Sequence, residues 1–218
     1  MPRIARIVVP EMPHHITQRG NRRQKVFFSN RDKQYYLKLL KTYAKEKGVK
    51  FWAFSLMENH VHFIAVPKYK DSFAKGFGEA HRRYSRMVNL RENWRGYLWQ
   101  GRFDSYPMED VHLFYAIRYV ERNPVRAGIV KLAEDYHWSS ANAHVKGEEH
   151  ALLETNYYIQ GIPDWKKYLE EPTKKELLKC FRQHSRTGRP MGGVDYIEKL
   201  EEITGRNLKK LKPGPKKK

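Results

Sequence analysis

Two apolar, strand-like runs lie almost back to back in the middle of the chain. KFWAFSLM (50–57) and HVHFIAVP (60–67) are separated by only Glu58 and Asn59, and Pro67 ends the second run. Two residues are enough to join antiparallel strands, whereas a parallel connection needs about a dozen or more. The pair therefore predicts a β-hairpin within an antiparallel sheet.

The segments around this hairpin alternate between strand and helix patterns. They comprise a strand that runs into a basic Gly-Asn turn (14–28), a helix (30–48), a second helix (71–92), one or two short strands (97–109) and a third helix (109–122). This order predicts an α+β fold, in which helices cover an antiparallel sheet, rather than a doubly wound parallel sheet.

The pattern loosens towards the C-terminus. Residues 1–145 are interpreted as one domain and residues 146–172 as a linker or wrapping segment. Residues 173–218 are interpreted as a small helical DNA-binding extension, with helices near 173–184 and 194–204 and a basic, disordered tail.

Charge indicates the kind of partner. Lys and Arg number 43 against 24 acidic residues, which gives a formal net charge of +19. Such an excess favours a polyanion, most often nucleic acid, over a basic protein that is merely soluble or touches anionic membranes. Aromatic residues make up 13% of the chain and offer stacking surfaces for unpaired bases.

The remaining composition narrows the class of protein. No apolar run approaches the roughly 20 residues of a membrane span, and the N-terminal segment is too interrupted by proline for a signal peptide. The single cysteine, Cys180, excludes a disulfide framework and a cysteine-rich zinc site. These observations predict a cytoplasmic, nucleoid-associated protein without a membrane partner.

Two histidines stand one residue apart in the second strand of the hairpin. Because alternate side chains of a strand share a face, His60 and His62 point the same way as Ile64 and Val66. Two residues along a strand span roughly 6.5 Å, so both imidazoles can converge on one metal ion. The alternative is a hydrogen-bonded pair at the end of a strand.

The helix at 109–122 carries two stripes. An apolar stripe, the expected core face, consists of Leu113, Ala116, Ile117 and Val120, and a second, displaced stripe consists of His112, Tyr115, Tyr119 and Asn123. A tyrosine and an asparagine four residues apart therefore project together beside the core. Alternatively, the tyrosine packs at the sheet edge and the asparagine ends the helix before Pro124.

Together these motifs resemble the single-tyrosine HUH transposases. The sequence is most similar to the REP-associated tyrosine transposases, relatives of the IS200/IS605 enzymes. The resemblance covers about residues 8–145 and rests on five blocks that occur in the same order: HHITQRGNRRQKVF, SLMENHVHFIAVP, LWQGRFDSYPMED, RYVERNPVRAGIV and EDYHWSSANAH. A further match, TGRPMGG (187–193), lies nearer the C-terminus. It implies the ferredoxin-like palm of an HUH endonuclease, with 1–145 as the catalytic domain.

The resemblance also implies a chemistry. His60 and His62 would be ligands of Mg²⁺ or Mn²⁺, with Asn123 as the third ligand. Tyr119 would be the nucleophile, and Tyr115, one turn earlier, is the rival. Attack on a phosphodiester would leave a 5′-phosphotyrosine and a free 3′-OH, so that the reverse reaction joins strands without ATP.

The implied function is a metal-dependent single-stranded DNA endonuclease and strand transferase that cleaves at hairpin-forming, REP-type sequences. Two alternatives remain: a catalytically silent protein that binds hairpin repeats, and the transposase of an active insertion sequence. The expected partner is single-stranded DNA with a hairpin, and the expected assembly is a monomer or homodimer. Residues 173–218 are expected to add DNA affinity without contributing chemistry.

Seven arginines are predicted to contact the DNA backbone. Six lie in two segments of the chain, and one follows the helix that carries Tyr119. They are Arg19, Arg22 and Arg23 in the loop after the first strand, Arg82, Arg83 and Arg86 on the second helix, and Arg126. For each the alternative is an ordinary solvated surface position. Trp99, Phe103 and Trp138 are predicted to be core residues rather than stacking platforms.

Overall fold

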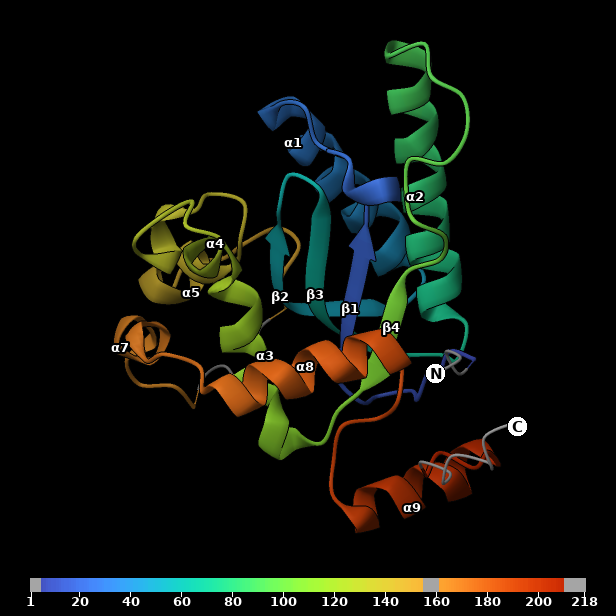
Figure 1. Cartoon of the computed structure of the whole chain (residues 1–218), viewed down its shortest axis with the longest axis vertical. Helices are drawn as coiled ribbons and strands as arrows, with labels where there is room; N and C mark the ends of the chain where they lie inside the picture. Colours follow the sequence, from blue (N-terminus) through green and yellow to red (C-terminus); the bar gives the residue numbers. More distant parts are fainter. Residues whose placement is uncertain (1–4, 155–160, 210–218) are drawn as a thin grey trace, which may run out of the picture.

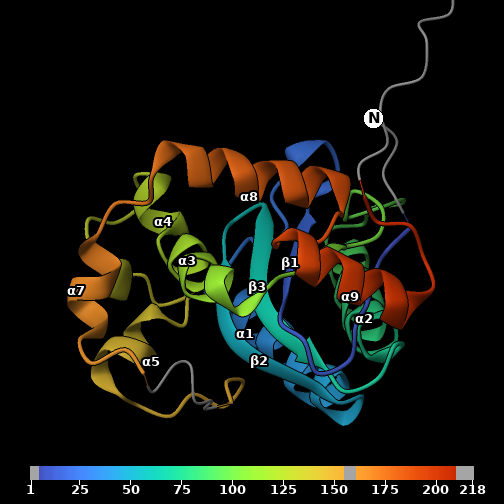
Figure 2. The same ribbon diagram turned by 90° about the horizontal axis from the view of Figure 1, so that it is seen from below.

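A four-stranded antiparallel sheet forms the centre of the computed structural model, which describes residues 5–154 and 161–209. The strands are β1 (His14–Arg19), β2 (Val49–Leu56), β3 (His60–Pro67) and β4 (Asp104–Pro107), and they lie in the order β2-β3-β1-β4. Strands β2 and β3 form the predicted hairpin, in which Leu56 pairs with Val61. Figures 1 and 2 show the sheet between two layers of helices, so the predicted α+β class is confirmed.

Helices α1 (Asn30–Leu39) and α2 (Ser72–Arg91) cover one face of the sheet, and a π-helical turn (Leu40–Ala44) continues α1. Ser29 and Asp32 form a capping box that satisfies backbone N–H groups at the start of α1. Asp32 also forms an ion pair with Arg91, which joins α1 to the end of α2. Helix α2 packs closely on this π-helical turn at Gly76, where an added Cβ would lie only 2.8 Å from the Cα of Ala44.

Helices α3 (Asp110–Glu121) and α8 (Lys175–Thr187) cover the opposite face, and α7 (Trp165–Glu170) packs against α3. The predicted apolar stripe of α3 is fully buried against the sheet, which confirms that part of the pattern. The regular helix is interrupted at Arg122, two residues before Pro124, and the short helix α4 (Asn123–Arg126) follows. Two further helices are α5 (Ala141–Lys146) and α9 (Val194–Thr204), and short 3₁₀ turns lie at Asn21–Arg23 and Ala133–Asp135.

The alternation of β3 divides the core into two hydrophobic clusters. Val61, Phe63 and Ala65 pack with α1 and α2, whereas Ile64 and Val66 pack with α3. The even-numbered face that carries His60 and His62 is therefore the α3 side, in agreement with the strand pattern. The predicted core positions are also confirmed: Trp99, Phe103 and Trp138 are all buried.

The C-terminal helices pack on the rest of the chain. Phe181 of α8 is fully buried in the cluster that contains Ile117 of α3, and Leu200 of α9 packs against Ile7 near the N-terminus. Trp165 and Leu169 of α7, within the segment interpreted as a linker, are buried in the same cluster as Phe181. The division into domains stays a prediction, and residues 210–218 of the tail lie outside the described residues.

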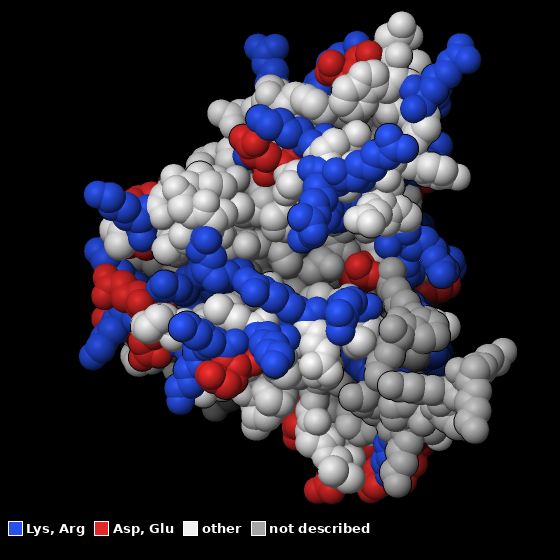
Figure 3. Space-filling model, in the orientation of Figure 1, with Lys and Arg blue, Asp and Glu red and all other residues white. Residues whose placement is uncertain are grey.

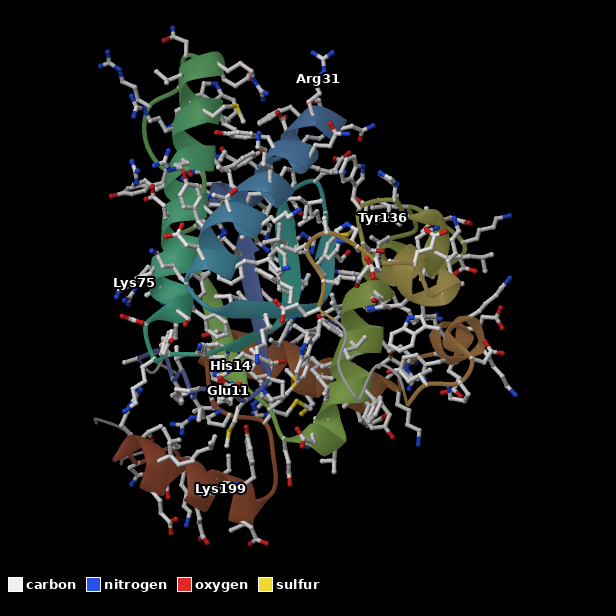
Figure 4. All side chains as sticks on the ribbon, turned by 180° about the vertical axis from the view of Figure 1, so that it is seen from behind. Glu11, His14, Arg31, Lys75, Tyr136 and Lys199 are labelled. Atoms are coloured by element: carbon white, nitrogen blue, oxygen red, sulfur yellow. The ribbon has the colours of Figure 1, made fainter. Side chains whose placement is uncertain are left out.

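The opposite side of the molecule is shown in Figure 4. There Arg31 and Lys75 point away from the body, whereas His14 lies within it and is fully buried. Within residues 5–154 and 161–209, no helix has the length and apolar character needed to cross a bilayer.

Candidate active site

A cavity of about 550 Å³ opens where β1 and β3 meet the end of α3. All four residues predicted to carry the chemistry line it: His60, His62, Tyr119 and Asn123. The other lining residues are Thr17, Arg19, Gln100, Asp104, Arg126, Ala127, Arg182, Ser185 and Arg186. Figure 3 shows a band of Lys and Arg over α8 with further Lys and Arg above it, on either side of a hollow in this face.

Strand register brings the polar lining residues together. Arg19 of β1 pairs with His60 of β3, and Thr17 pairs with both His62 and Asp104 of β4. Directly paired residues of an antiparallel sheet point to the same face. The three strands therefore present their polar side chains to one side, beneath α3.

Hydrogen bonds fix the orientation of the His60 ring. Its Nδ1 lies 2.6 Å from Oδ1 of Asn59, and its Nε2 lies 3.4 Å from Nδ2 of Asn123. Burial, followed by the positive charges of Arg19 and Arg126, lowers the pKa of His60 to about 4. The ring is therefore neutral at neutral pH, and with a proton on Nδ1 it keeps a lone pair on Nε2.

His62 is held by a residue that sequence reasoning missed. Nε2 of His15 lies 2.9 Å from Nδ1 of His62, and the two rings are nearly parallel, with an interplanar angle of 9°. Burial first, and then neighbouring His15, His60, Arg126 and Arg19, hold the pKa of His62 well below its usual value. The alternation in HHITQR places His15 on the face of Thr17 and Arg19, but only strand pairing shows that this face meets His62.

Arg126 joins the tyrosine to the asparagine. Its guanidinium lies 4.1 Å from the centroid of the Tyr119 ring, and it donates to the Tyr119 carbonyl (2.7 Å) and to Oδ1 of Asn123 (3.1 Å). Burial lowers the pKa of Arg126 to about 10, so the side chain stays cationic at neutral pH.

The two tyrosines of the predicted stripe lie in different environments. Tyr119 is 7% exposed and lines the cavity, whereas Tyr115 is 44% exposed and is not among the lining residues. Tyr115 instead lies beside the guanidinium of Arg118, 5.6 Å from the ring centroid. Of the two, only Tyr119 has a side chain placed to act with His60 and His62.

Helix α8 supplies one wall of the cavity. Phe181 packs on the Tyr119 ring, and Arg182, Ser185 and Arg186 line the cavity. The spacing of these residues places them on one side of a helix, but nothing in the sequence alone shows which surface that side meets. Sequence reasoning therefore missed their place at the site.

The other predicted DNA-contacting arginines lie outside this cavity. Arg22 and Arg23 are exposed on the turn after β1 with φ of 50° and 64°, a left-handed conformation that is uncommon for residues other than glycine. The Nδ2 group of Asn59 donates to the Arg23 carbonyl at 3.2 Å. The basic turn is thus tied to the same asparagine that holds His60.

Helix α2 carries a second hollow of about 650 Å³. Arg82, Arg83 and Arg86 line it together with apolar side chains, including Leu90. Arg82 and Arg83 are paired with Glu79 at 2.8 Å and 2.6 Å, which compensates part of their charge.

Comparison with known proteins identifies the family. Residues 8–123, more than half of the chain, match the family model described as "Transposase IS200 like". The chain belongs to the IS200-like transposase family. The predicted resemblance to these transposases is therefore confirmed, and no curated protein matches the sequence.

Two solved structures are similar to the fold of this IS200-like chain. One is a REP-associated tyrosine transposase bound to a REP hairpin, with 18% identity and a TM-score of 0.58, covering 72% of this chain and 93% of the other. This likeness supports the fold. The other is a protein from Deinococcus radiodurans R1 assigned provisionally as a transposase, with 20% identity and a TM-score of 0.39, covering 56% of this chain and 97% of that one.

Proposed function

We propose that this IS200-like chain is a metal-dependent endonuclease and strand transferase that acts on single-stranded DNA beside a hairpin of the REP type. The observation that carries the proposal is the meeting of His60, His62, Tyr119 and Asn123 in one cavity. Their residue types fit phosphodiester transfer, since they combine a nucleophile, two neutral imidazoles and an amide.

The charge of the cavity fits a phosphate substrate. Four guanidinium groups line it, from Arg19, Arg126, Arg182 and Arg186, and Asp104 is the one carboxylate among the lining residues that the structure describes. Guanidinium groups match phosphate oxygens in geometry as well as in charge. We therefore assign a DNA phosphate to this cavity.

The side chains present fit a divalent ion in part. Both imidazoles have Nδ1 engaged by a neighbour, so each can present Nε2 to a metal. The Oδ1 atom of Asn123 accepts from Arg126, so its amide nitrogen faces His60, and an amide flip is needed for oxygen coordination. Across the described residues no three His, Cys, Asp or Glu side chains form a metal group, so water or phosphate oxygens would complete the coordination.

Mg²⁺ or Mn²⁺ bound there would neutralise charge on the scissile phosphate. The Tyr119 oxygen attacks phosphorus, the bond from phosphorus to the 3′ oxygen breaks, and the leaving oxygen takes up a proton while the phenol loses one. The guanidinium of Arg126 is placed to stabilise negative charge that develops on the phenol oxygen. Attack by the free 3′-OH on the phosphotyrosine reverses the step.

The surface near the cavity fits unpaired bases. Tyr97 is 83% exposed and Trp94 is 41% exposed. Leu98 directly follows Tyr97, and its carbonyl accepts from the backbone N–H of Asn21 at 2.8 Å. The loop that carries Trp94 and Tyr97 therefore lies beside the basic turn after β1. Exposed aromatic rings among arginines favour single strands, whose bases are free to stack.

A second candidate is a hairpin-binding protein that does not cleave. The burial of Tyr119 beneath Phe181 and Arg126 favours it, because a nucleophile must reach its substrate.

An adduct assay separates the two functions. Hairpin oligonucleotides with an unpaired flank, labelled at either end, are incubated with Mg²⁺, with Mn²⁺ or with chelator.

A 5′-phosphotyrosine transfers only the 3′ label to the protein, and chelator abolishes this transfer. Transfer of the 5′ label would contradict the proposed polarity. Tight binding without an adduct in either metal would favour the silent protein.

A further inference from the structure

A row of buried polar groups runs from His62 away from the cavity. Nε2 of His15 lies 2.9 Å from Nδ1 of His62, and Nδ1 of His15 lies 2.9 Å from the Tyr106 hydroxyl. His15 and Tyr106 are each 1% exposed, and neither lines the cavity.

The row has two possible directions of donation. In one, His62 donates from Nδ1 to Nε2 of His15, and His15 donates from its Nδ1 to the Tyr106 hydroxyl. His62 then keeps a bare lone pair on Nε2. In the reverse direction His15 donates to Nδ1 of His62, and the neutral His62 ring carries its proton on Nε2, where it cannot bind a metal.

The surroundings favour the first direction. Because Nδ1 of His62 is turned to His15, the Nε2 side of the ring faces a cavity lined by Arg19 and Arg126. A lone pair directed at cationic groups is stabilised, whereas an N–H directed at them is repelled. His60 follows the same arrangement, since Asn59 occupies its Nδ1.

We propose that His15 is a positioning residue that keeps the proton of His62 on Nδ1, and that Tyr106 holds His15 in the matching orientation. The proposal rests on the metal-binding role proposed for His62. The site consequently includes β4, which supplies no proposed metal ligand. Metal-binding histidines in proteins generally donate their second ring N–H to a neighbouring acceptor, and His15 would be that acceptor for His62.

Metal binding without DNA tests the proposal. Mn²⁺ affinity is measured by calorimetry on the full-length protein and on four variants: His15→Leu, His15→Gln, Tyr106→Phe and His81→Gln. His81 is the matched control, a buried histidine that hydrogen-bonds Tyr36 on the other face of the sheet. Thermal unfolding verifies that each variant is folded.

We expect His15→Leu to weaken Mn²⁺ binding by about 10-fold to 100-fold, the usual cost of losing such a partner. His15→Gln is expected to restore most of the affinity, because its carbonyl oxygen can accept from His62. Tyr106→Phe removes a single hydroxyl and is expected to weaken binding several-fold, with His81→Gln unchanged. Wild-type affinity in both His15→Leu and Tyr106→Phe would overturn the proposal.

Nitrogen NMR of the metal-free protein reads the tautomer directly and does not depend on metal binding. We expect the His62 proton on Nδ1 in the wild type and a mixture of tautomers in His15→Leu. A wild-type His62 protonated on Nε2 would also overturn the proposal. A wild type that binds no Mn²⁺ but has the expected tautomer would instead contradict the metal dependence of the proposed function while supporting the role of His15.

Discussion

Phe181 of α8 lies against Tyr119 of α3, with ring centroids 4.8 Å apart and the planes inclined by 33°. The proposed nucleophile is thus packed between an aromatic ring from the C-terminal part of the chain and the guanidinium of Arg126. The expectation that residues 173–218 contribute affinity without chemistry stays a prediction. The structure nevertheless places α8 in direct contact with the tyrosine.

This packing makes Tyr119→Phe a clean test of the nucleophile. The substitution keeps the ring that contacts Phe181 and Arg126 and removes only the attacking oxygen, so folding and DNA binding are expected to persist. The covalent adduct should fall below detection in the labelled-hairpin assay. Tyr115→Phe is the matched control and should retain the adduct, because Tyr115 does not line the cavity. The opposite result would reassign the nucleophile to Tyr115.

His60→Ala and His62→Ala are each expected to reduce cleavage by about 100-fold or more and to weaken Mn²⁺ binding. Each removes one of two neutral imidazoles that line the cavity. Initial cleavage rates at saturating DNA and calorimetric Mn²⁺ titrations measure the two effects. His137→Ala, at an exposed position, serves as the control. Unchanged metal binding in both variants would leave the pair as hydrogen-bonded structural histidines.

A hairpin with an unpaired flank should be cleaved in strong preference to a blunt perfect duplex. The phenol is recessed in the cavity, and a flexible backbone can enter where a stiff duplex cannot. Tyr97→Ala should weaken binding to unpaired oligonucleotides by about 1–3 kcal/mol, the usual value of one stacked base. Fluorescence anisotropy compares it with Tyr69→Ala, whose side chain is 54% exposed on a different loop. Equal losses in both variants would remove the stacking role of Tyr97.

Removal of residues 210–218 should weaken DNA binding at every sequence and flatten its dependence on salt. The segment contains five lysines and no acid, so its contribution is that of phosphate neutralisation. Cutting after Lys209 keeps the ion pair of that residue with Glu198, at 2.7 Å, and the contact of Arg206 with the Arg6 carbonyl, at 3.1 Å. Binding at several salt concentrations measures the slope. A sequence-dependent loss would instead indicate base recognition by the tail.

Stability should fall as the pH drops below about 6. Burial lowers the pKa of His81 to about 3, while the unfolded chain takes up this proton near the ordinary value of about 6.5. Between these values the unfolded state binds more protons, so each pH unit of acidification costs about 1.4 kcal/mol for this group. His14, with a pKa lowered by burial to about 4, acts in the same direction.

Urea unfolding at pH 7.5, 6 and 5 measures this effect for the wild type and His81→Gln. The variant lacks one titrating group, so the two free energies of unfolding should converge as the pH falls. Parallel curves would show that His81 has the same pKa in the folded and unfolded states, and would contradict the prediction.

Local periodicity in the sequence was enough to predict the strands of the sheet, helices α1, α2 and α3, and the faces that carry the proposed chemistry, but not the short helices α5 and α7. The period of two in HVHFIAVP places His60 and His62 on one face, and the helical period places Tyr119 with Asn123. Both predictions hold because a side chain's direction within an element depends only on that element's backbone. The lysine and arginine excess likewise predicted the anionic partner that we propose.

Contacts between elements were decided only by the tertiary structure. His15 meets His62 because β1 pairs with β3 in one particular register, and a shift by one residue would turn His15 to the other face. Arg126 reaches back to Tyr119 because the chain turns at Asn123, and Phe181 covers the tyrosine because α8 packs across the sheet. Register and packing are selected by burial summed over segments far apart in the chain, a quantity that no local pattern contains.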